Sequence, residues 1–397
     1  MPPATSLQKS LELIRLLKIK GGKDFPYGRT ALRPTPSSGA RLCSIAAPLV
    51  LFSNKDKSKT KLSSEATNTP QPTPPLILRK FMKKTSLFLI FALNAVSVFA
   101  FENFTIKITP ETGITNGNLY EYVFEDKCTN TNNQESFLDW QVKNLFFAGV
   151  NLESDIKKYF NISFDCRVYI PKLSGKMQDF DWLNFSNYPD DNPMELTNYS
   201  IHDNYLEKFY KFGISAGRNF IFDKIKLTPY LAWNYSFIQF SGKNGYGLYK
   251  WNKWNNYSFE GRTVIDYNNE INSFLLGFKT IVTPSQHFEA GINFALSPAL
   301  SFISAIDKHY ENTTASGTLY LDVMNFSWDI KSSVFVRYSF NKYNSIGFKC
   351  DAELIPLTKG SDYSCYLPAT SVSKNQGVQG GTSRFLFSAS IFYTLSL

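Results

Sequence analysis

Histidine and cysteine are both scarce in this sequence. Only three histidines occur among 397 residues, and none has the His-x-x-x-His spacing of a zinc site. Four of the five cysteines follow residue 100: Cys128, Cys166, Cys350 and Cys365. An even number permits disulfides in an oxidising compartment without specifying the pairs. We expect Cys350 to pair with Cys365, because the two flank one predicted loop.

Charged residues are also few, and their distribution argues against a nucleic-acid-binding protein. The formal net charge is +9, yet from residue 101 onward 26 lysines and arginines are outnumbered by 29 aspartates and glutamates. The basic excess is therefore confined to the beginning of the chain. Because the body of the protein is slightly acidic, we expect no nucleic-acid partner.

The chain has one long apolar run, and it is too short for a stable transmembrane helix. Residues 82–100, "MKKTSLFLIFALNAVSVFA", combine two lysines, an apolar core and a small-residue exit. This pattern predicts a bacterial secretory signal that is cleaved after Ala100. Such a signal is read at the N-terminus, so we expect residues 1–81 to be a non-native or disordered extension. The alternative is a transit peptide in the amphipathic segment "SLQKSLELIRLLKIK".

The sequence is rich in the period-two alternation that is typical of β-strands. Aromatic residues make up 16% of the chain, and in residues 225–237 large apolar side chains alternate with polar ones. No segment after residue 100 has the pattern of a long helix. We predict ten strands, at residues 116–126, 138–152, 158–173, 200–219, 222–241, 257–283, 286–306, 316–329, 332–354 and 382–397.

Ten alternating strands behind a secretory signal predict an all-β protein. We expect residues 101–397 to form a ten-stranded antiparallel transmembrane β-barrel with long extracellular loops. A secreted β-sandwich would use shorter strands and fewer aromatic residues on one face. The short turns, which face the periplasm in such barrels, are expected near residues 153–157, 219–223, 283–286 and 329–332. The long external loops are expected near residues 127–137, 174–199, 242–256, 307–315 and 355–381.

Two short polar pairs fall in the second and fourth long loops, at the external rim. Asp179 and Asp181 form an Asp-x-Asp sequence, and Asp307 and His309 form an Asp-x-His sequence. In extended backbone, residues two apart point to the same side. Two close carboxylates resist double ionisation, and an aspartate that binds one imidazole nitrogen leaves the other free as a general base. The two pairs together could therefore carry out hydrolysis.

Plainer interpretations of these pairs remain open. Carboxylates in an exposed loop are commonly solvated or form turns. A calcium or zinc site could use the three carboxylates and the histidine, although no metal-ligand spacing supports it. A hydrolase of the Ser-His-Asp type is a further alternative.

The motifs together resemble the omptin family of outer-membrane endoproteases. "DFDW" at 179–182 and "DKHY" at 307–310 match the family in order, spacing and loop number, and "LDW" at 138–140 and "TNYSIH" at 197–202 are similar as well. The resemblance covers roughly residues 116–397. It implies an aspartic-type endopeptidase of the bacterial outer membrane whose active site faces outside. In such an enzyme Asp307 would orient His309, a water would lie between His309 and Asp179, and Asp181 would support Asp179.

The resemblance also implies a substrate groove, from which this sequence departs. Glu121 corresponds to an acidic residue that receives a basic side chain, and Ser200 and His202 would line the groove. The aspartate that usually accompanies Glu121 is replaced by Ala305, and Asn198 stands where a further acidic residue is expected. One carboxylate binds a guanidinium less firmly than two. The sequence therefore predicts a weakened preference for cleavage between basic residues.

The partners implied by the resemblance are a peptide or protein substrate and an outer-membrane lipid. The family's lipopolysaccharide clamp corresponds to Trp233, Tyr235 and Phe237, which include no arginine or glutamate, so a different lipid partner or none is implied. We expect a monomer without cofactor or metal. Two other functions are open: a catalytically inactive adhesin or receptor that uses loop aromatics such as Trp251 and Trp254, and a small porin. The narrow lumen of ten strands disfavours the porin.

Overall fold

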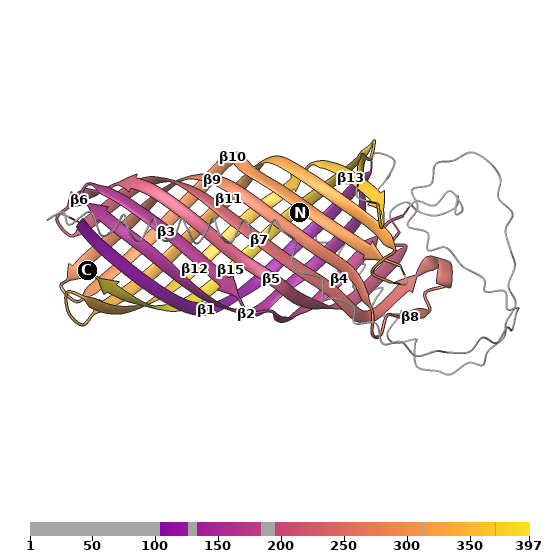
Figure 1. Cartoon of the computed structure of the whole chain (residues 1–397), viewed down its shortest axis with the longest axis horizontal. Coiled ribbons are helices and arrows are strands. Elements are labelled where there is room, and N and C mark those ends of the chain that lie inside the picture. The colour runs from indigo at the N-terminus through magenta and orange to yellow at the C-terminus, as the bar shows by residue number, and fades with distance from the viewer. Residues whose placement is uncertain (1–103, 126–132, 184–194, 312, 370) are drawn as a thin grey trace, which may run out of the picture. The chain divides into compact units, whose positions relative to one another are not determined.

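The computed structural model describes residues 104–125, 133–183, 195–311, 313–369 and 371–397, and these residues form a closed β-barrel (Figure 1). The predicted extension, the predicted secretory signal and Cys128 lie outside the described residues. Over the described ranges, no helix is long and apolar enough to cross a membrane.

The described residues form a barrel of ten long antiparallel strands, as predicted. Two of them are interrupted and carry two labels each, β3 with β4 and β12 with β13. The ring closes because β1 pairs with β15 and β10 pairs with β11. The strands are β1 (Phe104–Glu125), β2 (Gln134–Ile156), β3 (Phe160–Tyr169), β4 (Lys172–Asp181), β5 (Asn198–Arg218), β7 (Ile225–Tyr249), β9 (Thr263–Ser285), β10 (Phe288–Tyr310), β11 (Gly317–Ser339), β12 (Asn344–Lys359), β13 (Ser361–Tyr366) and β15 (Val378–Ser396).

Four short elements lie at the two ends of this barrel. They are β6 (Phe220–Phe222), the 3₁₀ turn η1 (Lys250–Asn252), β8 (Asn256–Ser258) and β14 (Ser373–Lys374). The connections after β2, β5, β9 and β11 are tight and lie at the same end as the C-terminus, whereas β8 and β13 lie at the opposite end (Figure 1). We call this opposite end the mouth of the barrel.

One predicted turn is wrong. Residues 329–332 lie inside β11, and the chain turns at 340–343 instead. Asp329 and Lys331 are polar because they face the lumen, where the Lys331 ammonium lies 3.4 Å from the Asp329 carboxylate. A lumen-facing polar pair therefore has the same sequence appearance as a turn.

The long loop expected at 355–381 is also largely wrong, and with it the expected disulfide. Residues 344–366 form a nearly continuous strand, so Cys350 and Cys365 lie at opposite ends of one extended segment. Cys350 is opposite Val334 on β11, whereas Cys365 is opposite Leu319. Both thiols are free, as is that of Cys166.

A belt of exposed apolar side chains surrounds the outside of the barrel, because every second residue of a strand points away from the lumen. On β10 the belt reaches Phe302, and on β11 it reaches Phe326. The strands continue well past this belt toward the mouth. Asp307 lies roughly 16 Å beyond Phe302 at the usual rise of an extended strand. The mouth therefore stands clear of the surface that faces lipid.

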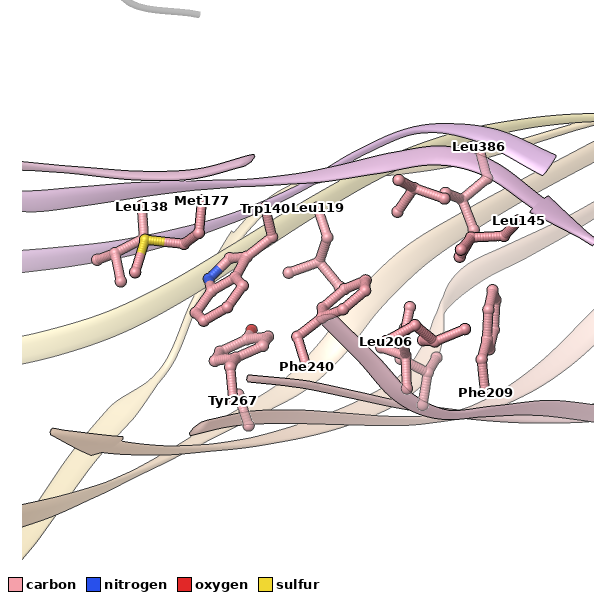
Figure 2. Close-up of a cluster of buried hydrophobic side chains, with 14 of the residues drawn as sticks. Leu119, Leu138, Trp140, Leu145, Met177, Leu206, Phe209, Phe240, Tyr267 and Leu386 are labelled. Carbon is pink, nitrogen blue, oxygen red and sulfur yellow. The ribbon is translucent and has the colours of Figure 1, made fainter. Parts of the chain in front are cut away.

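Two layers of different chemistry fill the lumen. The layer nearer the tight turns is ionic: the Glu353 carboxylate accepts hydrogen bonds from Arg384 and from Lys211. The layer nearer the mouth is apolar, and Figure 2 shows its central stack, in which the ring of Trp140 lies 5.8 Å from that of Phe240 and 5.3 Å from that of Tyr267. We call this second layer the apolar floor. It includes Leu119, Met177, Ile303, Ala305, Met324 and Leu386.

Candidate active site

The mouth is lined by polar residues that alternate with the apolar floor along each strand. Asp179 follows Met177 by two positions, and Asp307 follows Ala305 in the same way. Because residues two apart share a face, these acidic side chains stand directly above buried apolar ones. The site is therefore carried by strands β4 and β10. The expectation that both polar pairs lie in loops is wrong, because these strands extend further than their sequence pattern indicates.

Asp307 and His309 form one half of the site. Nε2 of His309 donates a hydrogen bond to Oδ2 of Asp307. Asp307 is buried, while 23% of the His309 side-chain surface stays accessible. Since Nε2 is engaged, the second ring nitrogen, Nδ1, is the one that can exchange a proton with a ligand.

Asp179 and Asp181 form the other half, on the opposite wall. Around the ring, β5, β7 and β9 separate β4 from β10 on one side, so the two pairs face each other across the mouth. Ser136 donates to Asp179 at 3.5 Å, and Nδ2 of Asn198 donates to Asp181 at 3.2 Å. Asn198, which stands where an acidic residue was expected, thus supports Asp181.

Electrostatics links the two halves of the site. Burial raises the pKa of Asp179 well above its usual range, and the neighbouring charge of Asp181 raises it further. The positive charge of His309 acts in the opposite direction on both carboxyl groups and lowers their pKa. The carboxyl groups of one wall and the imidazole of the other therefore influence each other's proton affinity across the mouth.

Ser200 and His202 are buried in the wall of the mouth. Nδ1 of His202 donates to the backbone carbonyl of Asn244 at 2.6 Å, so Nε2 accepts the hydrogen bond of the Ser200 hydroxyl at 2.8 Å. Ser200 is 4% exposed and His202 is fully buried. Burial lowers the pKa of His202 to about 4, so this imidazole is neutral. The two side chains form a hydrogen-bonded support within the wall of the mouth.

A Gly-x-Ser-x-Gly sequence is present at Gly213 to Gly217, and its place in the fold excludes a nucleophile elbow. It lies within the extended β5 strand, whereas an elbow requires a sharp turn from a strand into a helix. The hydroxyl of Ser215 is hydrogen-bonded to that of Ser163 on β3 at 2.9 Å. This serine is part of the barrel wall.

Three further carboxyl groups lie at the mouth, those of Glu121, Asp322 and Asp362. Of these, the sequence analysis singled out only Glu121. Glu121 on β1 accepts a hydrogen bond from the indole of Trp140 at 3.4 Å. Asp322 on β11 and Asp362 on β13 are directly opposite each other. Neither lies in a recognisable motif. The only sequence signal for Asp322 is an acidic residue at a position that alternates with the apolar Met324.

Within the described residues, no three histidine, cysteine, aspartate or glutamate side chains are grouped so that they could hold a metal ion. The arrangement is instead that of paired acid and base groups around the mouth.

Comparison with known proteins then identifies the type of barrel. A model of the Omptin family matches residues 101–364. The chain belongs to the omptin family.

One solved structure agrees with this membership at the level of the fold. The crystal structure of the outer membrane protease OmpT from Escherichia coli is similar with a TM-score of 0.64 and 18% sequence identity, over 74% of this chain and 97% of that chain. The translocator domain of the autotransporter NalP from Neisseria meningitidis has a TM-score of 0.27 and 7% identity, over 78% and 97% of the two chains. No protein with a curated description matches. This omptin is a β-barrel of the bacterial outer membrane, as predicted.

The outer face of this omptin is aromatic at Trp233, Tyr235 and Phe237, the positions that were expected to correspond to a lipopolysaccharide clamp. Tyr235 on β7 stacks on Trp233 and on Tyr210, with ring centroids 6.4 and 6.1 Å apart, and Phe237 stacks on Tyr210 at 5.2 Å. These rings form a stacked ladder on the outer face of β7. A different lipid partner, or none, stays a prediction.

Proposed function

We propose that this omptin is a surface endopeptidase that hydrolyses peptide bonds of peptides or proteins with an activated water. The observation that carries the proposal is the facing arrangement of two pairs, Asp307 with His309 on β10 and Asp179 with Asp181 on β4, across the mouth. A peptide bound at the mouth would pass between them.

In the proposed reaction His309 is the general base. Its Nδ1 takes a proton from a water held between the two walls, while Nε2 stays bound to Asp307. The hydroxide attacks the carbonyl carbon, and His309 then passes the proton it took from the water to the leaving amine as the C–N bond breaks. The attacking group is water, so no acyl-enzyme forms.

Asp179 supplies the complementary function on the opposite wall. Burial and the charge of Asp181 raise the pKa of Asp179, which favours the protonated form of this carboxyl group. A neutral carboxyl group can donate a hydrogen bond to the carbonyl oxygen as negative charge develops there. Asp181, held by Asn198, maintains this state of Asp179.

A serine mechanism is a poorer account of the same mouth. Ser200 does donate to His202, as a nucleophile would donate to its base. However, His202 is oriented by the backbone carbonyl of Asn244 instead of a carboxylate, and the pair is buried. The Ser200–His202 pair thus lacks the carboxylate that orients the base in a serine triad.

The proposal is tested with cells that display residues 82–397 and a fluorogenic peptide library. The His309→Ala variant, at equal surface abundance, should lose cleavage. His287→Ala is the matched control, because His287 lies in the tight turn at the other end of the barrel, where its ring stacks on Tyr338. Retained cleavage in His309→Ala, or no cleavage by the unmodified protein with or without outer-membrane lipid, would refute the endopeptidase and favour the adhesin or receptor alternative.

A further inference from the structure

Four aromatic rings line the mouth between the two halves of the candidate site. They come from the end of β7 and from residues 251–259, and β7 lies between β4 and β10 around the ring of strands. The Tyr249 ring lies 5.6 Å from that of Trp251 and 6.3 Å from that of Tyr257, measured between centroids. The Tyr257 ring in turn lies 5.0 Å from that of Phe259. We call these four side chains the aromatic wall.

The register of the strands places the aromatic wall on the same face as the carboxyl groups of the candidate site. Asp181 is directly opposite Asn198 on β5, and Asn198 is directly opposite Tyr249 on β7. Residues directly opposite each other in antiparallel strands point to the same face of the sheet. Gly247 is likewise opposite Tyr257 on β8. The aromatic wall therefore continues the lining of the mouth beyond Asp181.

Gly247 leaves the space in which the Tyr249 ring lies. A Cβ atom at position 247 would stand 2.5 Å from this ring, so any other residue would displace it. The backbone that follows is fixed as well. The N–H of Lys250 donates to the carbonyl of Thr197 at 2.8 Å. The N–H of Trp254 donates to the carbonyl of Tyr249 at 2.9 Å. The aromatic wall is thus preorganised, which lowers the entropic cost of binding a ligand.

One edge of the aromatic wall is packed, and the other is open to water. Phe259 is 7% exposed, and its ring lies 5.1 Å from that of His202. Trp251 and Tyr257 are 54% and 39% exposed. Strand β8 lies at the mouth, away from the apolar belt, so contact with lipid does not account for this exposure (Figure 1). Large aromatic side chains that gather at one exposed place mark a site for a ligand.

The closeness of the aromatic wall to the carboxyl groups indicates which ligand it takes. Burial raises the pKa of Tyr249, and the charges of Asp179 and Asp181 raise it further. A group bound to the wall therefore lies near the bond that these carboxyl groups would help to break. A side chain of the substrate, a short distance along the chain from the scissile bond, meets this condition.

We propose that the aromatic wall is a specificity-determining subsite that binds one aromatic or large aliphatic side chain of the substrate, on the side of the scissile bond that faces β7. This inference rests on the proposed endopeptidase function. A peptide that passes between the two pairs extends over β7 on one side, where Trp251 and Tyr257 offer exposed rings to an apolar side chain. Aromatic rings prefer offset-stacked or edge-to-face contacts with one another. The wall therefore selects substrates by an apolar residue near the scissile bond.

The test uses the full-length protein in outer membranes and a peptide that it cleaves, with phenylalanine or alanine placed in turn at each position flanking the scissile bond. At one position, phenylalanine should raise kcat/KM roughly 10-fold over alanine, mainly through KM. Tyr257→Ala and Trp251→Ala should each bring this ratio to within about twofold of one, whereas Tyr257→Phe should keep it because the ring is retained. Tyr343→Ala is the control and should leave the ratio unchanged, since Tyr343 is 50% exposed in the tight turn at the other end of the barrel.

Two results would overturn the proposal: equal rates with phenylalanine and alanine at every position, or a phenylalanine preference that survives both alanine substitutions. Binding of the same peptides, labelled with a fluorophore, to the His309→Ala variant separates failure of the wall from failure of the endopeptidase. If the unmodified protein cleaves nothing, the endopeptidase fails and binding tests the wall alone. Binding that favours phenylalanine and requires Tyr257 then supports the wall, and binding that is absent or ignores Tyr257 overturns it.

Discussion

Nε2 of His309 is hydrogen-bonded to Asp307, and this contact sets the proton affinity of the ring. Burial alone lowers the pKa of His309, but the charge of Asp307 and the hydrogen bond to it prevail and raise the pKa to about 9. A histidine in an unfolded chain titrates near 6.5. The pair therefore stabilises the fold fully below about pH 6.5, and this contribution is lost as the pH rises through about 9.

The activity should have the opposite pH dependence, because a general base must be unprotonated. We expect kcat/KM to rise between pH 7 and pH 9 with an apparent pKa near 9. Asp307→Asn should shift the apparent pKa of this pH–rate profile toward 6.5 and lower the maximal rate. Hydrolysis of one peptide by outer-membrane vesicles across this pH range measures both effects, and an apparent pKa that does not move would show that Asp307 leaves His309 unaffected.

The Ser200→Ala variant should keep kcat within about tenfold of the unmodified protein, because the serine supports His202 and does not attack the substrate. His309→Ala should reduce kcat roughly 10²- to 10⁴-fold, as expected for loss of a general base. Steady-state rates of the two variants on the same peptide make the comparison. Equal losses would restore the serine mechanism.

Gly317→Ala should impair the site without touching a reacting group. Gly317 has φ +147°, and a Cβ atom there would stand 1.9 Å from the backbone oxygen of His309. The strand must shift, so we expect a fall in kcat together with a modest loss of stability. Gly261→Ala is the matched control, since Gly261 has φ +73° but open space around it. Peptide hydrolysis and thermal unfolding of both variants decide the point: equal rates would mean that the β10 backbone tolerates the shift.

Glu353→Gln should destabilise the barrel more than the loss of any surface pair. The substitution leaves Arg384 and Lys211 buried without their shared carboxylate, which costs roughly 3–5 kcal/mol of unfolding free energy. Glu207→Gln breaks a half-exposed pair with Lys243 and should cost about 0–1 kcal/mol. Urea unfolding in detergent measures both, and similar midpoints for the two variants would show that the ionic layer contributes little.

Most of the barrel could be predicted from alternation, because one face of each strand meets lipid or the apolar floor. The errors occurred where inward-facing residues are polar. Asp329 and Lys331 suggested a turn although they face the ionic layer, and the polar residues around Asp362 suggested a loop although they pair with β11. The polarity of a segment alone does not distinguish a strand that faces a polar lumen from a loop between strands.

The candidate site was predictable only where it consists of residues close in sequence. Asp307 and His309 share a face by virtue of their spacing, and so do Asp179 and Asp181. The position of Asp322 at the mouth could not be predicted in this way, because it depends on the register that sets Asp322 opposite Ala305 and beside Gly380. Such register depends on the pairing of whole strands and cannot be deduced from a single segment.

The rise of the strands beyond the lipid-facing belt gives the mouth a fixed height. Paired strands hold side chains more rigidly than free loops do, and a strand tilt of about 40° puts Asp307 roughly 12 Å above Phe302 along the barrel axis. A chain anchored in the same membrane can present a segment to the mouth only if it extends to that height. The height of the site above the bilayer thus limits which membrane-anchored chains can reach it, before any side chain is recognised.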